Sequence, residues 1–458
     1  MTDHPGSPVE SPRIAPPIEG GSPASLLPPD HPDRSFLAQE VHARPPEALD
    51  TPSRITYVAV LVPRDDRDRE WQRVVALCDH FDVQPPLRDA SHFTTRLGVV
   101  RLKWERHSEF SSFTFVAAGL SPSPFSDPPI SCLPPGWLAS IPGRTLLAAH
   151  AKVVPMGAQE PDAQSLAMHF DDQIVVGAEI GGGAGFAFTD FRVRADGFER
   201  LLVVDRSFTP RQCGRMVQRL FEIEAYRMMA LLALPLVRPV SAEIVADEQA
   251  LTGLTAALAS GGADDEALLQ RLTRLAAEVQ GTVTRTQFRF SACRAYHELV
   301  TARIAELRER RLPGIQPIEE FMSRRFSPAV ASCLSTAQRL RELSERIGQA
   351  SALLSTRVDI VHEQQNQRLL ESMNIRAERQ FRLQQAVESL SVAAIVYYVA
   401  GLIGYLAKAL KSAGIGINPE LTVGIAIPFI ALACLWALRR AHRRLARLGA
   451  PPVAASRR

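Results

Sequence analysis

Five polar residues near the N-terminus are of the types that bind metals or transfer protons. They are His31, Arg34, Glu40, His42 and Arg44. Imidazole and carboxylate groups serve as metal ligands and as general acids or bases. Glu40 and His42 share a face on a strand but not on a helix. No further ligands follow at a recognised spacing, so we favour capping, salt bridging or docking of the N-terminal arm over a metal or acid–base site.

Oxygen ligands also occur near the C-terminus, in the run Gly-Ile-Asn-Pro-Glu at 416–420. The amide of Asn418 and the carboxylate of Glu420 are groups that a hard divalent cation prefers. The same run is typical of a tight turn. Lys408 and Lys411 place positive charge nearby, which a cation pathway avoids. A plain turn is therefore favoured, and a cation-binding mouth is the alternative.

Other candidate motifs indicate no reaction. The glycine-rich run at 179–186 lacks the Lys-Ser/Thr of a phosphate-binding loop and precedes a strand pattern, which favours a hairpin turn. Asp190 and the sequence Asp-Arg-Ser at 205–207 have no His or Cys partner at a nucleophile spacing. We therefore expect a protein that is not an enzyme and holds no cofactor, with a divalent cation only under the alternative.

Strands dominate the pattern of the first half of the chain. About seven segments rich in β-branched residues or with alternating polarity predict strands. They cover residues 54–62, 97–104, 110–118, 146–154, 174–180, 186–193 and 198–204. A helix is expected at 71–81. This half is therefore predicted to be an α/β domain.

The pattern becomes helical at Thr209, which is followed by proline as an N-cap is. This helix is expected to run to Pro235. Two further helices are expected at 241–259 and 264–311, and the second of these is expected to be interrupted near Gly281. The first half and the second half of the chain thus differ in secondary structure.

One very long helix is predicted to follow Pro328. No proline occurs between Pro328 and Pro419, so a helix of roughly 80 residues can run from about residue 329 into an apolar segment. Its apolar residues step by threes and fours, as in a coiled coil. They are Leu340, Leu343, Ile347, Ala350, Leu354, Val358 and Val361. Their partner is either the helix at 264–311 or a copy in another subunit.

Two apolar segments, at about 390–410 and 421–438, predict a transmembrane hairpin. The second is followed by the sequence Arg-Arg-Ala-His-Arg-Arg at 439–444, and such positive charge stays on the cytoplasmic side. With two spans, both termini are expected in the cytoplasm.

Composition limits the partners further. A net charge of +3 gives no basic surface for nucleic acid. Six cysteines without paired spacing indicate reduced thiols. No apolar segment of a signal peptide occurs at the N-terminus, and the proline-rich residues 1–29 predict a disordered tail.

These patterns predict an α/β N-terminal cytoplasmic domain, then long α-helices in a coiled-coil-like stalk, then a two-helix transmembrane hairpin. The expected parts are a tail at 1–29, the α/β domain at 30–208, the long helices at 209–388, the hairpin at 389–438 and a basic cytoplasmic tail at 439–458.

Four segments carry a family resemblance. They are the motif at 31–45, the glycine-rich run at 177–186, the sequence Asp-Arg-Ser-Phe-Thr-Pro-Arg-Gln at 205–212 and Leu-Ser-Val-Ala-Ala at 390–394. Together they resemble an uncharacterised bacterial membrane-anchored family, domain of unknown function 3422, over residues 30–444. The resemblance implies the bacterial inner (cytoplasmic) membrane and transfers no catalytic roles.

The order of the parts is similar to that of the CorA class of divalent-cation channels. There a cytoplasmic α/β unit leads through a very long helix into the first of two spans, which ends in Gly-Met-Asn before an acidic loop. Here Gly416, Ile417 and Asn418 stand at that place, with Glu420 after them. The resemblance implies that Asn418 and Glu420 meet a hydrated cation at the outer mouth.

Two functions follow from these observations. The first is an integral membrane protein whose cytoplasmic domain is a self-associating or partner-binding module held in the lipid bilayer by two spans. The alternative is a CorA-like divalent-cation transporter, which requires a ring of subunits because two spans enclose no pore. We expect a homo-oligomer that does not bind nucleic acid.

Overall fold

The structure is a computed structural model that describes residues 31–34, 37–38, 46–171, 173–260, 264–412, 416 and 418–448. Among these residues, side chains are described as far as residue 437, except at 163 and 164, and at residue 440. The predicted tail at 1–29, the motif residues Glu40, His42 and Arg44, and residues 449–458 lie outside the described residues.

The chain divides into two compact units, which are described separately. The first unit consists of Met1–Ser260 and Gln270–Gln349, and the second of Gly261–Leu269 and Ala350–Arg458.

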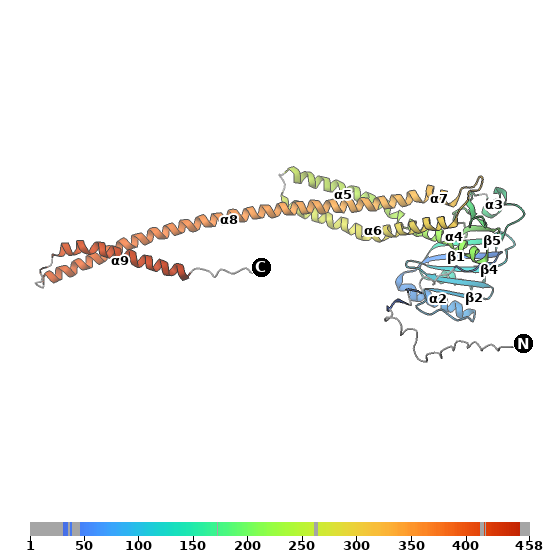
Figure 1. Cartoon of the computed structure of the whole chain (residues 1–458), viewed down its shortest axis with the longest axis horizontal. Helices are drawn as coiled ribbons and strands as arrows, with labels where there is room; N and C mark the ends of the chain where they lie inside the picture. The colour runs from blue at the N-terminus through green and yellow to red at the C-terminus, as the bar shows by residue number, and fades with distance from the viewer. Residues whose placement is uncertain are drawn as a thin grey trace, which may run out of the picture. The chain divides into compact units, whose positions relative to one another are not determined.

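An eight-stranded mixed sheet lies in the first unit (Figure 1). Its order is β2-β3-β4-β1-β5-β8-β7-β6, in which β5 and β8 are parallel and the other neighbours are antiparallel. The strands are β1 (Ser53–Leu61), β2 (His92–Leu97), β3 (Val100–Arg106), β4 (Ser111–Ala118), β5 (Arg144–Pro155), β6 (Val176–Ile180), β7 (Gly185–Thr189) and β8 (Glu199–Asp205). The predicted α/β character of this half is confirmed.

Two details of the strand prediction were wrong. β2 was missed because it is an edge strand with little burial, and its sequence HFTTRL carries a weak pattern. β7 ends at Thr189 instead of 193, because Phe191 has a φ of +53°, which no strand accommodates. The glycine-rich run is the turn of the β6–β7 hairpin, as predicted.

Helices cover the two faces of the sheet. The helix α2 (Arg67–His80) shares a core with alternate residues of the strands, including Leu102 and Trp104 of β3. The helix α4 (Pro210–Leu231) packs on the opposite face, where Phe221 stacks on Tyr57. Two short helices also belong to this unit, α3 (Ala163–Phe170) and α7 (Ile318–Arg325).

The start of α4 is fixed by the predicted cap. Thr209 Oγ1 accepts a hydrogen bond from the backbone N–H of Gln212 at 3.3 Å, and Gln212 Oε1 accepts one from the N–H of Thr209 at 3.0 Å. This reciprocal capping box stabilises the first turn.

Three long helices lie side by side in the first unit (Figure 1). They are α5 (Leu234–Ser260), α6 (Asp265–Leu307) and the first part of α8 (Ser327–Ser412). Several helix boundaries differ from the prediction. The helix α2 begins four residues earlier, and α4 ends at Leu231 instead of near Pro235. The helix α5 begins seven residues earlier and continues through Pro239, and α6 ends at Leu307. The predicted interruption near Gly281 does not occur, since α6 is continuous there.

The coiled-coil pattern of α8 has its partner within the chain. Leu340, Leu343 and Ile347 are buried. Ser241 of α5 contacts Thr336 of α8 at 3.5 Å, and Glu248 of α5 pairs with Arg339 of α8 at 3.0 Å. Phe290 and Cys293 of α6 share a core with Val330 and Cys333 of α8. Both α5 and α6 therefore cover this part of α8, where the sequence suggested only α6 or another subunit.

The second unit contains the rest of α8 and the helix α9 (Pro419–Leu448). The predicted continuous helix of about 80 residues is confirmed, because α8 spans 86 residues. Its stripe of small residues packs on α9: Ala400 and Ala407 are buried, and a Cβ on Gly404 would lie 3.3 Å from Val423. Small residues allow such close approach of two helices.

Three helical stretches, not two, are long and apolar enough to cross a membrane. They are Pro210–Ser260, which comprises α4 and α5, Ile318–Ser412 and Pro419–Ala437. In the most apolar 18 residues of each stretch, the buried share is 28% in the first, 11% in the second and 0% in the third. The last two contain the segments predicted as spans.

A strap of residues 46–52 crosses the start of α4. The backbone N–H of Leu49 donates to the carbonyl of Pro210 at 2.9 Å. The strap runs so close to α4 that a Cβ on Gly214 would lie 1.6 Å from the carbonyl oxygen of Glu47. Only glycine leaves room for this crossing.

Replacing Gly214 with alanine should therefore destabilise the first unit. The added methyl group displaces the strap, at a cost on the order of 1–3 kcal/mol. Scanning fluorimetry of the purified full-length protein should show a lower melting temperature for Gly214→Ala. Gly253→Ala is the matched control, because Gly253 lies exposed on α5 with nothing within 4 Å. Alanine there should stabilise the helix by up to about 1 kcal/mol. Equal melting temperatures for both variants would contradict the packing described.

Candidate functional site

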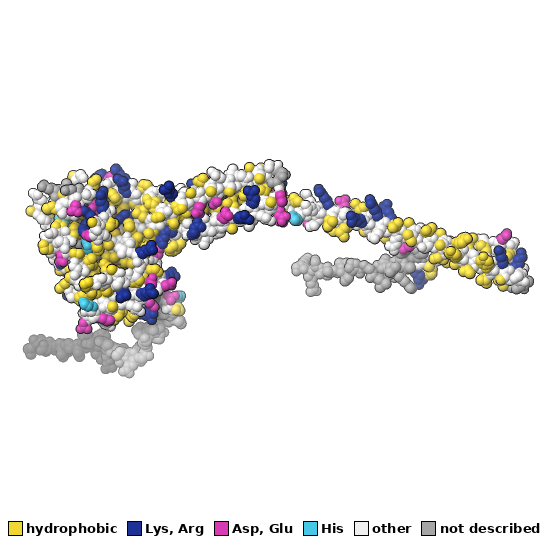
Figure 2. Space-filling view, turned by 180° about the vertical axis from the view of Figure 1, so that it is seen from behind, with side chains coloured by type: hydrophobic (Ala, Val, Ile, Leu, Met, Phe, Trp, Pro, Cys, Tyr) yellow, Lys and Arg dark blue, Asp and Glu magenta, His cyan; other side chains and the backbone are white. Residues whose placement is uncertain are grey.

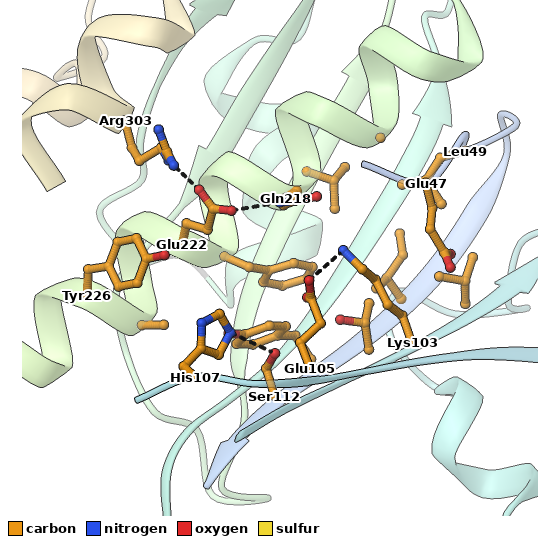
Figure 3. A pocket seen from close by; sticks show the side chains of 18 of the residues that line it. Glu47, Leu49, Lys103, Glu105, His107, Ser112, Gln218, Glu222, Tyr226 and Arg303 are labelled. Atoms are coloured by element: carbon orange, nitrogen blue, oxygen red, sulfur yellow. Dashed lines mark hydrogen bonds and ion pairs between the residues drawn. The ribbon is translucent and has the colours of Figure 1, made fainter. Parts of the chain in front are cut away.

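A cavity of about 270 Å³ lies between α4 and the sheet (Figure 3). Its floor is formed by β1, β3 and β4, its roof by α4, and its rim by the strap and by Arg303 of α6. All these parts belong to the first unit. Concave sites with a few converging polar groups are where small ligands bind.

An ion pair lies on the sheet wall. Lys103 Nζ and Glu105 Oε1 of β3 are 3.0 Å apart, and each side chain is only 9% exposed. Register places Thr114 opposite Lys103 and Ser112 opposite Glu105 on β4. Hydroxyl groups therefore surround the pair. Burying two charges is costly, so this pair is weak evidence of a contribution to stability.

A second ion pair comes from the helices. Arg303 Nε of α6 donates to Glu222 Oε2 of α4, and Gln218 Nε2 donates to Glu222 Oε1 at 2.7 Å. Arg303 also donates to Glu306 at 2.9 Å. The carboxylate of Glu222 is thus held in one position by two donors.

Aromatic rings make up much of the remaining wall. Tyr57 and Phe221 stack with ring centroids 4.6 Å apart, and Phe110 meets Tyr226 edge to face at 6.5 Å. Burial raises the pKa of Tyr57 and of Tyr226 well above the ordinary tyrosine value, and nearby carboxylates add to the effect. Both hydroxyls therefore keep their protons and can donate hydrogen bonds.

His107 and Ser112 also meet in the cavity. His107 Nε2 lies 3.4 Å from Ser112 Oγ, and its ring stacks on Phe110 at 4.2 Å. A histidine that activates a serine lies about 2.6–3.2 Å from it, and often farther when no substrate is bound. Stacking on Phe110 holds the His107 ring at the cavity, where it can contact a ligand.

The described residues among those singled out from the sequence lie outside the cavity lining. His31 and Arg34 are exposed, and His31 Nδ1 is 3.8 Å from Asp33. Asn418 and Glu420 are exposed at the start of α9, where the carbonyl of Asn418 accepts from the N–H of Thr422 at 3.1 Å. Within the described part of the chain, no three His, Cys, Asp or Glu side chains are grouped to hold a metal ion.

Comparison with known proteins identifies the family. Residues 29–445 match the model of a family described as protein of unknown function, DUF3422. The chain belongs to this family. No curated protein and no solved structure matches significantly. Membership of DUF3422 confirms the predicted domain of unknown function and assigns no activity.

The sequence of this DUF3422 protein contained one signal for the cavity. In β3, Lys103 and Glu105 alternate with the buried Leu102 and Trp104. Such alternation ordinarily indicates a strand with one face in water. Only the docking of α4 turns that polar face into a cavity wall, and α4 follows about a hundred residues later in the chain.

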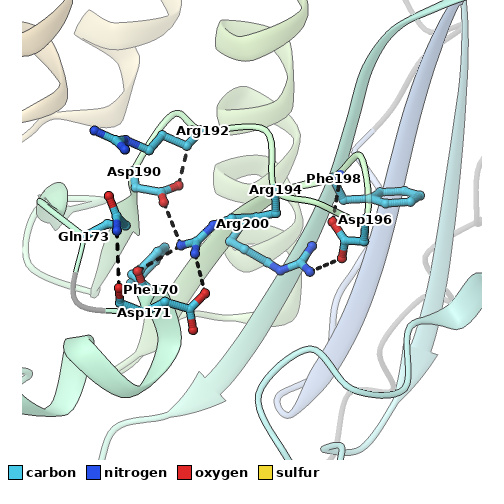
Figure 4. A network of polar contacts seen from close by, with 9 residues as sticks. All are labelled: Phe170, Asp171, Gln173, Asp190, Arg192, Arg194, Asp196, Phe198 and Arg200. Carbon is cyan, nitrogen blue, oxygen red and sulfur yellow. Dashed lines mark hydrogen bonds and ion pairs between the residues drawn. The ribbon is translucent and has the colours of Figure 1, made fainter.

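Polar networks elsewhere in the first unit are structural. Arg194 donates to Asp190 at 2.7 Å and to the carbonyl of Phe170 at 3.0 Å, and it also pairs with Asp171 (Figure 4). The pair formed by Arg200 and Asp196 lies in the same region. These contacts join the end of α3 to the connection between β7 and β8.

Two carboxyl groups are buried together beside this region. Arg227 Nη2 lies 2.5 Å from Glu224 and 3.4 Å from Glu199, and both glutamates are only 2% exposed. Burial, and then the negative charge of Glu224, raise the pKa of Glu199 well above the ordinary glutamate value. Glu199 therefore keeps its proton in the folded protein at neutral pH.

This arrangement predicts that stability falls as pH rises. Above about pH 4.5, the ordinary glutamate range, the unfolded chain releases the Glu199 proton while the folded protein keeps it. Each pH unit should then remove up to about 1.4 kcal/mol. Glu199→Gln keeps the neutral hydrogen-bonding shape and removes this term. Between pH 5 and pH 8 the melting temperature of the variant should therefore fall less than that of the wild type. Parallel curves would show that Glu199 is ionised in the folded state.

Proposed function

We propose that this protein is an integral membrane protein. The C-terminal end of α8 and the helix α9 cross the bilayer, and the sheet and the helical bundle lie in the cytoplasm. The observation that carries the proposal is the exposure of large apolar side chains on these helices. Tyr397, Phe429 and Leu432 are each more than 70% exposed. Figure 2 shows hydrophobic side chains covering this part of the surface, with charged side chains at its tip. Lipid is the covering that such a surface requires.

The third apolar stretch, Pro210–Ser260, belongs to the water-soluble part under this proposal. Its first half, α4, packs on the sheet. Its second half carries charged groups that hold other helices, since Glu243 accepts from Thr282 at 2.8 Å and pairs with Arg285 at 2.9 Å. Two spans keep both termini on the same side, and the arginines at 439–444 favour the cytoplasmic side.

A row of exposed residues on α8 supports self-association. We call this row the α8 seam. It comprises Leu369, Met373, Leu383, Val387, Ser391, Ala394, Tyr398, Gly401 and Tyr405, all exposed and spaced by multiples of about three and a half residues. At about 100° per residue, the centre of the seam lies roughly 100–160° around the helix from Ala400, Gly404 and Ala407, which contact α9.

A second copy of the chain is the partner that fits the seam. Membrane insertion orients all copies alike, so the same residues of two α8 helices meet in parallel, as in a coiled coil. The small residues Ser391, Ala394 and Gly401 permit close approach within the bilayer. The proposed function is thus that of a membrane-anchored module that self-associates through α8 and needs no chemical step.

Cysteine cross-linking tests this arrangement. Val387→Cys, on the seam just before the span, should form a covalent dimer when membranes are oxidised, because facing Cβ atoms lie within about 4.5 Å. Phe381→Cys is the matched control, since Phe381 is equally exposed but lies on another side of α8. The wild type reports any dimer made by native cysteines. Equal cross-linking at 381 and 387, or none at either, would contradict the seam.

The CorA-like channel is the second candidate. It is favoured by the continuous α8, which joins the helical bundle to the first span, and by the exposed Asn418 and Glu420 at the turn. A pore requires a ring of subunits, whereas the seam alone requires two. Light scattering of the protein in mild detergent distinguishes them, because a monomer or dimer excludes the channel.

A further inference from the structure

We propose that the cavity between α4 and the sheet binds a small zwitterion, a molecule that carries both an amine and a carboxylate on an apolar body, as an amino acid does. The proposal goes beyond membrane anchoring and self-association. It depends on the charges, the rings and the size of the cavity.

Charge is distributed evenly between two walls. The sheet wall contributes the pair Lys103 and Glu105, and the helix wall contributes the pair Arg303 and Glu222 (Figure 3). Each wall therefore offers one cation and one anion. Glu47 at the rim is neutralised outside the cavity, since Arg101 Nε lies 2.7 Å from its carboxylate.

A ligand with a single charge fits this lining poorly. A carboxylate alone would bind Lys103 or Arg303 and draw it from its partner. Glu105, whose side chain is 9% exposed, or Glu222, whose side chain is 19% exposed, would then lack its cation. An amine alone would leave a lysine or an arginine unpaired in the same way. Breaking a buried pair on one side is strongly unfavourable, because it leaves an uncompensated charge.

A zwitterion avoids this cost because its two groups compensate both charges of a pair at once. Its amine can lie between the carboxylates of Glu105 and Glu222, while its carboxylate meets Lys103 or Arg303. The protonated hydroxyls of Tyr57 and Tyr226 are further donors for that carboxylate. Because the ligand has no net charge, its binding leaves the number of positive and negative charges in the cavity equal.

The body of the ligand is set by the rings and the volume. Tyr57, Phe110, Phe221 and Tyr226 present apolar and aromatic surface to the cavity. The volume of about 270 Å³ lies just below the range of about 300–1,000 Å³ usual for ligand pockets, so the ligand is a small metabolite and not a nucleotide or a lipid. An amino acid with an aromatic or large aliphatic side chain has this size and chemistry.

Calorimetric titration of the purified full-length protein in detergent tests the proposal. The probes are L-phenylalanine, phenethylamine, which lacks the carboxylate, and 3-phenylpropionate, which lacks the amine. L-phenylalanine should bind at least about tenfold more tightly than either analogue, a difference of about 1.4 kcal/mol. This comparison uses the wild type and depends on no variant being folded. No binding of L-phenylalanine, or equal binding of an analogue, would overturn the proposal.

Variants then locate the site. Glu222→Gln removes one carboxylate from the helix wall and should weaken L-phenylalanine binding by at least about tenfold. Glu243→Gln is the matched control, because it removes an ion pair of the same unit that lies outside the cavity lining. A melting temperature measured for each variant separates loss of binding from loss of folding. If Glu222→Gln unfolds, Lys103→Gln is the replacement on the sheet wall. Unchanged affinity in a folded variant would place binding elsewhere.

Discussion

Apolar side chains along α8 must be covered, and each stretch of the helix has a different covering. In the bundle, α5 and α6 bury Leu340, Leu343 and Ile347. Near its end, Ala400, Gly404 and Ala407 face α9. Between and around these contacts, the described protein leaves the α8 seam exposed. Hydrophobic surface of this extent is not stable in water, so the proposed lipid contact and the proposed second copy would both meet one physical requirement.

The cavity and the bundle share a helix. Arg303 on α6 closes the rim of the cavity through Glu222, and the same helix packs on α8, where Phe290 and Cys293 share a core with Val330 and Cys333. A helix is a stiff element, so the position of Arg303 is tied to the packing of the bundle. The strap adds a second constraint at the rim, because it can cross α4 only over Gly214.

Local rules predicted most of the fold. The cap at Thr209, the glycine hairpin and the proline-free α8 each depend on neighbouring residues, and the structure confirms all three. The cavity depends on residues far apart in the chain. Alternation in β3 taken by itself indicates only a strand with one face in water, because the docking of α4 on that face cannot be read from β3. The edge strand β2 and the passage of α5 through Pro239 were missed for a similar reason, because tertiary packing outweighs their weak local signals. Metal ligation at Asn418 and Glu420 stays a prediction.

The most direct measurement of the central claim is the side of the membrane on which each part lies. Cys132 is exposed in the sheet domain, so it serves as a natural probe beside a new cysteine, Gly416→Cys, between the proposed spans. In intact spheroplasts a membrane-impermeant maleimide should label the Gly416→Cys protein and leave the wild type unlabelled until the membrane is broken. Labelling of the wild type in intact spheroplasts, or protection of Gly416→Cys, would contradict a two-span protein with a cytoplasmic sheet domain.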